Sequence, residues 1–332
     1  MKKISKMTLG TVQLGMDYGI NNANGKPDMK ASYDILRTAL NNGVTSLDTA
    51  SAYGDSENVI GSYLKQSDEN PFITTKFFTT NPPGTQDTII EKEIYGHVEN
   101  SLQRLNVNKL DCLMLHRTID MTQHNKAVRN TLDKLLKENL IGMAGVSLYN
   151  PEDIDTMLED DIYQAIQIPI NIFDQRLIKT DKLSRLKQKR ITVFARSIFF
   201  QGLFYMDPDK MTDEDMLVYI KPYLTKLNNI SNKHKISKGQ LAVSYIRDLP
   251  GITSLVLGID TKEQLLENIK LMDGPKLNRE MINEIQEQFK NINVEKIMEI
   301  LSRPKKKIDK EGIYKRHLSR EKHINNDGRP YS

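Results

Sequence analysis

The chain has 332 residues, of which 38% are hydrophobic and 27% are charged, with one cysteine and no tryptophan. This composition is typical of a globular protein with a substantial core, and it excludes a disordered chain and an intramolecular disulfide. The formal net charge of +4 comes from residues 303–332, where ten Lys or Arg stand against four Asp or Glu, so residues 1–302 are net acidic. We therefore expect no nucleic-acid partner.

Basic residues open the chain, but no continuous apolar segment follows them. No stretch approaches the roughly 18 apolar residues that a membrane helix needs. We expect neither a signal peptide nor a membrane partner. We expect the protein to reside in the reducing cytoplasm. Cys112 lies within an apolar run and is expected to be a buried thiol.

Strand-like apolar runs alternate with amphipathic helical stretches eight times along the chain. We place the strands at residues 7–10, 45–48, 72–76, 110–115, 141–146, 165–168, 191–195 and 253–257. We place the intervening helices at residues 30–42, 56–66, 87–105, 124–139, 151–159, 180–189, 237–248 and 262–271. Beyond residue 275 the apolar spacing predicts one or two further helices, which end before Arg303.

Several helix starts carry capping residues. Thr261 with Gln264, and Ser237 with Gln240, have capping-box spacing. Asn150 precedes a proline and two acids, which predicts an N-cap acceptor there.

Strand-helix alternation requires parallel strands joined by right-handed crossovers, and it permits a closed barrel or an open doubly wound sheet. No Gly-x-Gly-x-x-Gly follows the first strand, so the usual dinucleotide site of an open sheet lacks its sequence support. The sequence therefore favours an α/β fold with a (β/α)8 TIM barrel over residues 1–302, including extra C-terminal helices. Residues 303–332 are expected to form a basic tail that is solvated or partly ordered. The alternative is that the tail docks over the barrel mouth or onto a partner subunit. The expected oligomeric state is a monomer or a homo-oligomer.

Four polar side chains follow predicted strands at the carboxyl edge, where barrel enzymes place their active sites: Asp48, Tyr53, Lys76 and His116. Together they suit hydride transfer to a carbonyl, because a tyrosine can protonate the developing oxygen anion. Lys76 beside Tyr53 is expected to lower the pKa of the phenol, and Asp48 to orient Lys76. His116 is expected to donate to the substrate oxygen. Taken singly, each residue has an ordinary structural reading, such as a cap or a satisfied core histidine.

At this point the chain resembles a known family. Residues 43–57, Gly-Val-Thr-Ser-Leu-Asp-Thr-Ala-Ser-Ala-Tyr-Gly-Asp-Ser-Glu, closely resemble the signature of the aldo/keto reductases. Thr75-Lys76 and Leu113-Met114-Leu115-His116 stand where that family places its lysine and histidine, and the resemblance spans roughly residues 7–270. It implies that the four polar residues form a catalytic tetrad, and that NADP(H) or NAD(H) binds across the barrel rim.

The resemblance also implies a set of cofactor-binding residues. They are Gly10, Thr11, Ser147, Gln167, Arg196, Ser197, Gly202, Gly258, Lys262, Gln264 and Asn268. Gln167 matches the glutamine that holds the carboxamide, whereas Leu148 stands where many members have Asn. Arg196 occupies the position of the aromatic ring that stacks on the nicotinamide, and a planar guanidinium is able to stack there and to meet phosphate.

NADPH is the expected cofactor, and NADH is the alternative because Lys262 is the one basic residue in a segment that also holds Asp260. The expected substrate is a small-molecule carbonyl, with a sugar-type carbonyl preferred, since residues 196–203 look like a bacterial subgroup that includes sugar-modifying reductases. Two other functions stay open: a cofactor-binding regulatory barrel without turnover, and a hydrolase or metal-dependent barrel. No His pair has metal-ligand spacing, so no metal is expected.

Overall fold

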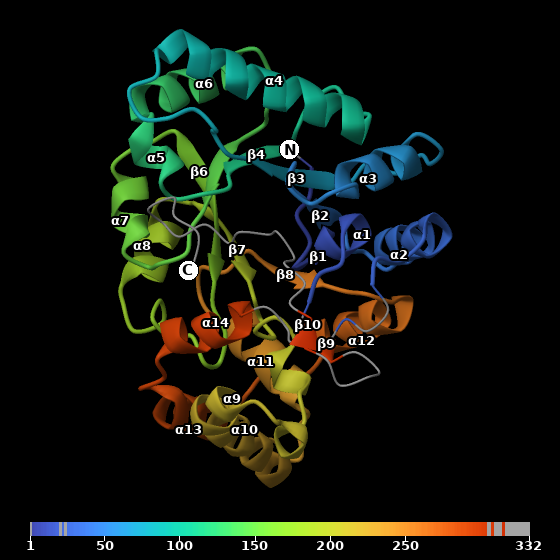
Figure 1. The fold of residues 1–332 in the computed structure, drawn as a ribbon, viewed down its shortest axis with the longest axis vertical. Helices are drawn as coiled ribbons and strands as arrows, with labels where there is room; N and C mark the ends of the chain where they lie inside the picture. The colour runs from blue at the N-terminus through green and yellow to red at the C-terminus, as the bar shows by residue number, and fades with distance from the viewer. Residues whose placement is uncertain (1, 20–21, 23–24, 304–306, 309–313, 316–332) are drawn as a thin grey trace.

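The computed structural model of the chain describes residues 2–19, 22, 25–303, 307–308 and 314–315. Its main sheet is a closed barrel in which the strands follow one another in chain order and β8 returns to β1 (Figure 1). The barrel strands are β1 Met7–Gly10, β2 Ser46–Asp48, β3 Phe72–Phe77, β4 Cys112–Leu115, β5 Ala144–Ser147, β6 Tyr163–Pro169, β7 Thr192–Arg196 and β8 Ser254–Gly258. All neighbouring pairs are parallel. The predicted (β/α)8 barrel is confirmed.

Helices surround the barrel and connect its strands (Figure 1). They are α1 Val12–Gly15, α2 Met29–Asn41, α3 Ser56–Leu64, α4 Asp87–Leu105, α5 Asp120–Gln123, α6 Asn125–Lys137, α7 Asp153–Leu158, α8 Lys182–Gln188, α9 Glu214–Tyr219, α10 Lys221–His234, α11 Lys238–Arg247, α12 Lys262–Met272, α13 Arg279–Phe289 and α14 Val294–Ser302. Those predicted from apolar spacing correspond to α2, α3, α4, α6, α7, α8, α11 and α12, and the two C-terminal ones to α13 and α14. Helices α9 and α10 lie in a stretch for which no helix was expected.

Two hydrophobic clusters hold these layers together. The larger one lies between the strands and the surrounding helices. The smaller one alternates with it along β4, where Cys112 and Met114 face inward and Leu113 and Leu115 face the helices. Because every strand is covered on both faces, the strands appear in the sequence as nearly continuous apolar runs. Cys112 is fully buried, as expected.

Two of the three predicted helix N-caps are found in the structure. Ser237 accepts a hydrogen bond from the Gln240 N–H, and Thr261 accepts one from the Gln264 N–H. The N-cap expected at Asn150 is wrong. Helix α7 begins at Asp153, and the Asp153 carboxylate instead accepts a hydrogen bond from the Asn150 N–H at 3.2 Å. Residues 150–152 therefore form a turn that precedes the helix.

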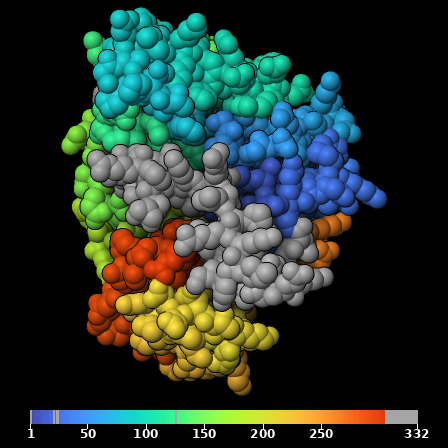
Figure 2. Space-filling model, viewed as in Figure 1, coloured from blue at the N-terminus to red at the C-terminus, as the bar shows by residue number. Residues whose placement is uncertain are grey.

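The last helices pack at one end of the molecule. Helix α10 packs on α13, and α9 packs on α14. Figure 2 shows α10 at the end opposite to α4 and α6. After α14, Lys307–Ile308 pairs antiparallel with Tyr314–Lys315, and the rest of the predicted tail beyond Arg303 lies outside the described residues. No helix within the described ranges is long and apolar enough to cross a membrane.

Candidate active site

Asp48 and Lys76 form a buried ion pair at the carboxyl edge of the barrel. The Lys76 Nζ donates to both carboxylate oxygens of Asp48, at 2.9 and 2.8 Å, and to the Thr49 carbonyl at 2.9 Å. This contact follows from strand register: Asp48 pairs with Thr74, and Lys76 lies two residues farther along β3, on the same face. Both side chains are almost completely excluded from solvent.

Tyr53 completes this group from the loop after β2. Its hydroxyl lies 3.4 Å from Lys76 Nζ, and its ring meets the His116 ring edge to face, with centroids 5.7 Å apart. The turn that carries Tyr53 presses against α1, since a Cβ on Gly15 would lie 1.7 Å from the Tyr53 carbonyl oxygen. His116 is held just after the end of β4, where its backbone N–H donates to the Phe77 carbonyl at 2.7 Å. The structure thus brings the four predicted catalytic residues together.

The protonation states differ in part from the expectation. Burial raises the pKa of Tyr53 well above its ordinary value, the charge of Asp48 raises it further, and the charge of Arg196 lowers it. The expected lowering by Lys76 is not found, because the Lys76 ammonium is matched by the Asp48 carboxylate. Tyr53 is therefore a protonated phenol at neutral pH, which is the form that an acid needs.

His116 is neutral. Burial lowers the pKa of His116 to about 3, and the charges of Lys76, Arg196 and Arg117 act in the same direction. Its Nδ1 is buried and has no hydrogen-bond partner among the described residues. A neutral imidazole has one N–H to donate, so His116 is able to orient an uncharged oxygen beside Tyr53.

Gln167 and Ser147 lie next to this group, at the ends of β6 and β5. The two residues are paired in register, and both are buried. The Gln167 Nε2 donates to Asp48 Oδ1 at 2.7 Å. Leu148 offers only its backbone N–H and carbonyl for hydrogen bonding, because its side chain is apolar and fully buried.

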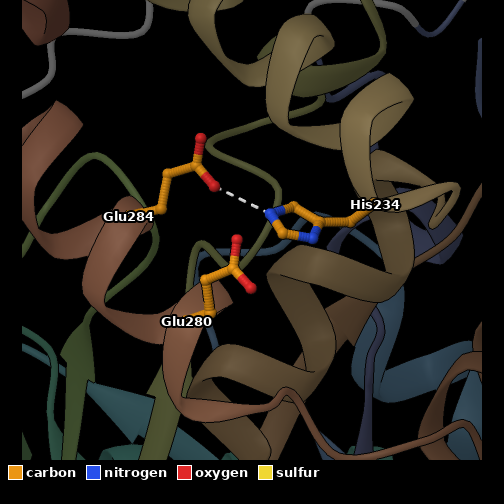
Figure 3. Close-up of side chains that lie close together, drawn as sticks. All are labelled: His234, Glu280 and Glu284. Atoms are coloured by element: carbon orange, nitrogen blue, oxygen red, sulfur yellow. Dashed lines mark hydrogen bonds and ion pairs between the residues drawn. The ribbon is translucent and has the colours of Figure 1, made fainter.

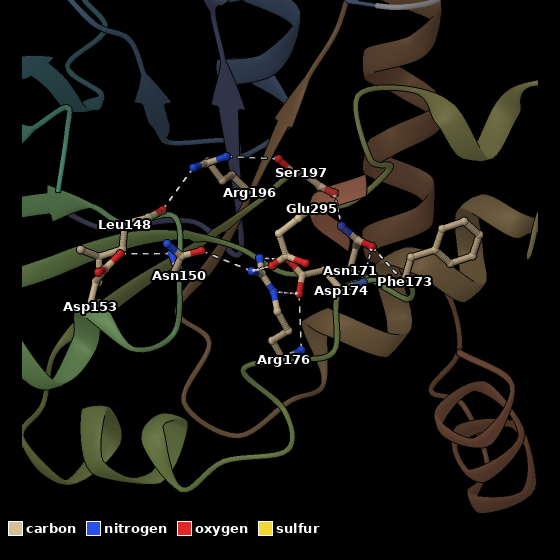
Figure 4. A network of polar contacts seen from close by, with 10 residues as sticks. All are labelled: Leu148, Asn150, Asp153, Asn171, Phe173, Asp174, Arg176, Arg196, Ser197 and Glu295. Carbon is tan, nitrogen blue, oxygen red and sulfur yellow. Dashed lines mark hydrogen bonds and ion pairs between the residues drawn. The ribbon is translucent and has the colours of Figure 1, made fainter. Parts of the chain in front are cut away.

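Arg196 ends β7 and turns toward the loop after β5. Its Nη2 donates to the Leu148 carbonyl at 3.2 Å and its Nη1 to Ser197 Oγ at 3.4 Å (Figure 4). The guanidinium carbon lies 4.7 Å from the centre of the Tyr149 ring. The sequence analysis did not single out Tyr149, although its place three residues after a predicted strand was a signal.

A polar network not expected from the sequence fixes the loops behind Arg196 (Figure 4). The Asn171 Nδ2 donates to the carbonyl of Ser197, a residue with a left-handed φ of 61°. Arg176 makes two 2.9 Å hydrogen bonds to Asp174 and one of 2.6 Å to Glu295 on α14. These bonds connect the loops after β6 and β7 to a C-terminal helix.

The residues predicted to meet the adenosine lie around the N-terminus of α12. The Gln264 Oε1 accepts from the Asp260 N–H at 2.7 Å, and Asn268 is buried on the helix. Lys262 begins α12. Burial raises the pKa of Asp260, whose Oδ1 has no hydrogen-bond partner in the described part of the chain.

The remaining predicted cofactor residues are glycines and one threonine. Gly10 pairs in register with Gly258, where an added Cβ would lie 2.8 Å from the Gln13 amide. Gly202 has a φ of 91° in the turn after β7. The Thr11 hydroxyl lies 2.8 Å from both the Asp48 carbonyl oxygen and Ser56 Oγ, so Thr11 supports the strand ends.

These groups match the chemistry of a nicotinamide dinucleotide. The amide of Gln167 is suited to a carboxamide, Arg196 and Ser197 are hydrogen-bond donors for phosphate, and a helix N-terminus favours anions. The Nδ1 of His116, which has no hydrogen-bond partner in the described part of the chain, leaves a polar atom available on the same edge. The residues present therefore fit the cofactor.

A cluster on α10 and α13 has the composition of a metal site but is internally satisfied. The His234 Nε2–H donates to the Glu284 carboxylate at 2.7 Å, and Glu280 lies beside them (Figure 3). Lys233 approaches both glutamates, at 2.9 and 3.3 Å. Because the Lys233 ammonium already pairs with both carboxylates, the cluster is best explained as an interhelix contact.

Comparison with known proteins agrees with this geometry. Residues 6–289 match the family model described as the aldo/keto reductase family. The chain belongs to the aldo/keto reductase family. Members are oxidoreductases that act on carbonyl compounds and generally use nicotinamide cofactors.

The aldo/keto reductase relatives are distant in sequence. The uncharacterized oxidoreductase YqkF of Bacillus subtilis is 24% identical over 86% of this chain and 93% of its own. The aldo-keto reductase YhdN of the same organism is 26% identical over 86% and 90%. A solved aldo-keto reductase of Bacillus halodurans in its holo form superposes with a TM-score of 0.69 and 21% identity, over 86% of this chain and 92% of that one. The structural likeness concerns the fold.

Proposed function

We propose that this aldo/keto reductase is an NAD(P)H-dependent carbonyl reductase in which Tyr53 is the general acid. The observation that carries the proposal is the grouping of the Tyr53 hydroxyl with Lys76 Nζ at 3.4 Å and with the His116 ring. A bound reduced nicotinamide supplies the hydride. The tetrad supplies the proton and the orientation of the carbonyl.

Each tetrad residue has a proposed role that follows from its protonation state or its hydrogen bonds. Tyr53, held protonated by burial, donates its proton to the substrate oxygen as negative charge develops there. His116, held neutral, donates a hydrogen bond to the same oxygen. Lys76 Nζ donates a hydrogen bond to the Tyr53 oxygen that loses the proton, and Asp48 orients Lys76.

NADPH is the proposed cofactor, and NADH is the alternative. Gln167 and Ser147 are assigned to the carboxamide, Arg196 and Ser197 to the nicotinamide and pyrophosphate, and Lys262, Gln264 and Asn268 to the adenosine. Lys262 favours a 2′-phosphate, whereas Asp260 opposes one by its charge. Binding constants for NADPH and NADH will decide between them.

A small carbonyl compound of sugar type is the proposed substrate. In support, one relative, 22% identical over 86% of this chain and 90% of its own, is named L-glyceraldehyde 3-phosphate reductase in Escherichia coli O157:H7. The proposed setting is the cytoplasm, with a monomeric or homo-oligomeric protein and no nucleic-acid or membrane partner.

The test is the loss of reduced-nicotinamide absorbance when the protein meets NADPH or NADH and a panel of aldehydes and ketosugars. Turnover should fall at least about a hundredfold in Tyr53→Phe, within the range that general acids contribute. Tyr95→Phe is the control, because Tyr95 lies on α4 with an exposed hydrogen bond to Glu138. Cofactor binding without turnover on any substrate would instead support a regulatory barrel, and absence of binding would overturn the proposal.

A further inference from the structure

Arg196 is a cation without an anionic partner at the edge of the tetrad. Its contacts within the described residues are all with neutral groups, namely the Leu148 carbonyl, Ser197 Oγ and the Tyr149 ring. No carboxylate within the described ranges forms an ion pair with it. The side chain is half-buried, so water screens its charge only in part.

Two other cations near the tetrad, Lys76 and Arg117, are each paired with a carboxylate. Lys76 is paired with Asp48 at 2.8 Å. Arg117, which follows His116, is paired with Asp120 through bonds of 2.7 and 3.1 Å. Arg196 is therefore the cation among these three whose charge stays uncompensated.

The charge of Arg196 reaches the reacting groups. It acts to lower the pKa of both Tyr53 and His116, so it favours negative charge on the Tyr53 oxygen and opposes positive charge on the His116 ring. A nicotinamide that lies beside the tetrad experiences the same field. Its reduced form is uncharged at the ring, whereas its oxidised form carries a positive charge there.

We propose that Arg196 makes this site discriminate between the redox forms of its cofactor, binding the reduced nicotinamide more tightly than the oxidised one. The inference rests on the proposed function, because it requires the nicotinamide to lie at Arg196. A neutral aromatic ring at this position would stack on both forms with no comparable charge penalty. The guanidinium stacks equally well but repels the cationic ring.

Such discrimination has a direct consequence for turnover. The reduced cofactor enters readily, and the spent, oxidised cofactor is released readily, because its ring is repelled by Arg196. The same preference stabilises the reduced form against oxidation, so Arg196 gives no help to the hydride step itself. Its effect is to accelerate the exchange of the oxidised for the reduced cofactor. Release of product often limits the rate of enzymes of this kind, so the exchange step is where a gain is useful.

The test compares ligands that differ in ring charge alone. Dissociation constants for NADPH and NADP⁺, and for NADH and NAD⁺, are measured by calorimetry on the wild type without substrate. We expect the oxidised form to bind about tenfold more weakly, equivalent to about 1.4 kcal/mol. In Arg196→Gln, which keeps a donor for the Leu148 carbonyl but loses the charge, the ratio should fall toward one. In Arg196→Lys the ratio should be retained.

Lys262→Gln is the matched control at the adenosine end. It should weaken the oxidised and reduced forms equally and leave their ratio unchanged. An unchanged ratio in Arg196→Gln, with both forms still bound, overturns the inference and leaves the proposed function standing. If the wild type binds neither form, the proposed function fails and the inference fails with it. Thermal unfolding of each variant confirms that the changes in binding belong to folded protein.

Discussion

Gln167 donates a 2.7 Å hydrogen bond to the same Asp48 oxygen that accepts from Lys76, so one carboxylate connects the predicted cofactor side of the site to its predicted catalytic side. All three side chains are buried, and Asp48 has almost no water-exposed surface on which to find another donor. The amide of Gln167 therefore helps to orient the Asp48 carboxylate.

Replacement of Gln167 by Leu should destabilise the fold, because it removes a donor from a buried carboxylate. We expect a loss of about 1.5–3 kcal/mol, the usual range for a hydrogen bond to a charged group. Urea unfolding monitored by circular dichroism measures it. Gln66→Leu is the control, since the Gln66 amide bonds to a carbonyl on the exposed side of α3 and should change stability by less than about 0.5 kcal/mol. Equal effects in both variants would contradict this role for Gln167.

The Asp48 and Lys76 pair should show strong energetic coupling. Asp48→Asn leaves a buried ammonium without its carboxylate, and Lys76→Met leaves a buried carboxylate without its ammonium. Each single change should cost about 3–5 kcal/mol, whereas the double variant should lose less than the sum of the two. A double-mutant cycle from urea unfolding gives the coupling energy. Simple additivity would show that the two charges are stabilised independently of each other.

Stability should depend on His116 between about pH 6.5 and 3. The folded pKa of His116 is lowered to about 3 by burial, whereas an unfolded histidine titrates near its ordinary value. The unfolded state therefore binds an extra proton in this window, and folding stability falls as the pH falls. The contribution is at most about 1.4 kcal/mol per pH unit.

The variant His116→Gln isolates this effect. The difference in unfolding free energy between wild type and variant, followed by urea titration from pH 7 to 4.5, should shrink in favour of the variant as acid is added. Carboxylates titrate in both proteins and cancel in the difference. A difference that is flat across this range would mean that His116 is charged or exposed in the folded protein.

The barrel and its tetrad could be predicted from the sequence because both depend on short-range pattern. The apolar runs mark each strand, and polar residues at strand ends meet at one edge whatever the connecting loops do. Asp48, Lys76 and His116 are residues of this kind. The signature around Tyr53 placed the fourth member.

Other features depend on contacts that no local pattern encodes. Helix α10 is stabilised by packing on α13, and its apolar residues Leu224, Leu227 and Ile230 form a short stripe that gave no distinct signal. The predicted N-cap at Asn150 is absent because its side-chain oxygen accepts a hydrogen bond from Arg176, at 3.3 Å, and not from a helix N–H. The pKa of Tyr53 follows from burial and from charge pairing, which become known only after the fold is closed.

Asn171 provides the prediction that tests the loop network. Its Oδ1 accepts from the N–H groups of Phe173 and Asp174, at 2.9 and 3.0 Å, while its Nδ2 donates to the Ser197 carbonyl at 3.1 Å. Asn171→Asp keeps both accepting contacts and removes the donor alone. The left-handed conformation of Ser197 then loses a support, because this conformation is strained for any residue except glycine.

We expect Asn171→Asp to lose about 1–2 kcal/mol of stability, since a bond is replaced by two facing oxygens. Calorimetric binding of the cofactor should weaken about tenfold, because Ser197 and Arg196 no longer hold their places at the end of β7. Asn171→Ala, which loses the acceptor as well, should be less stable than Asn171→Asp but bind the cofactor with similarly reduced affinity. Undiminished cofactor binding in Asn171→Asp would mean that the end of β7 is held by the barrel alone and that the network serves only to anchor α14.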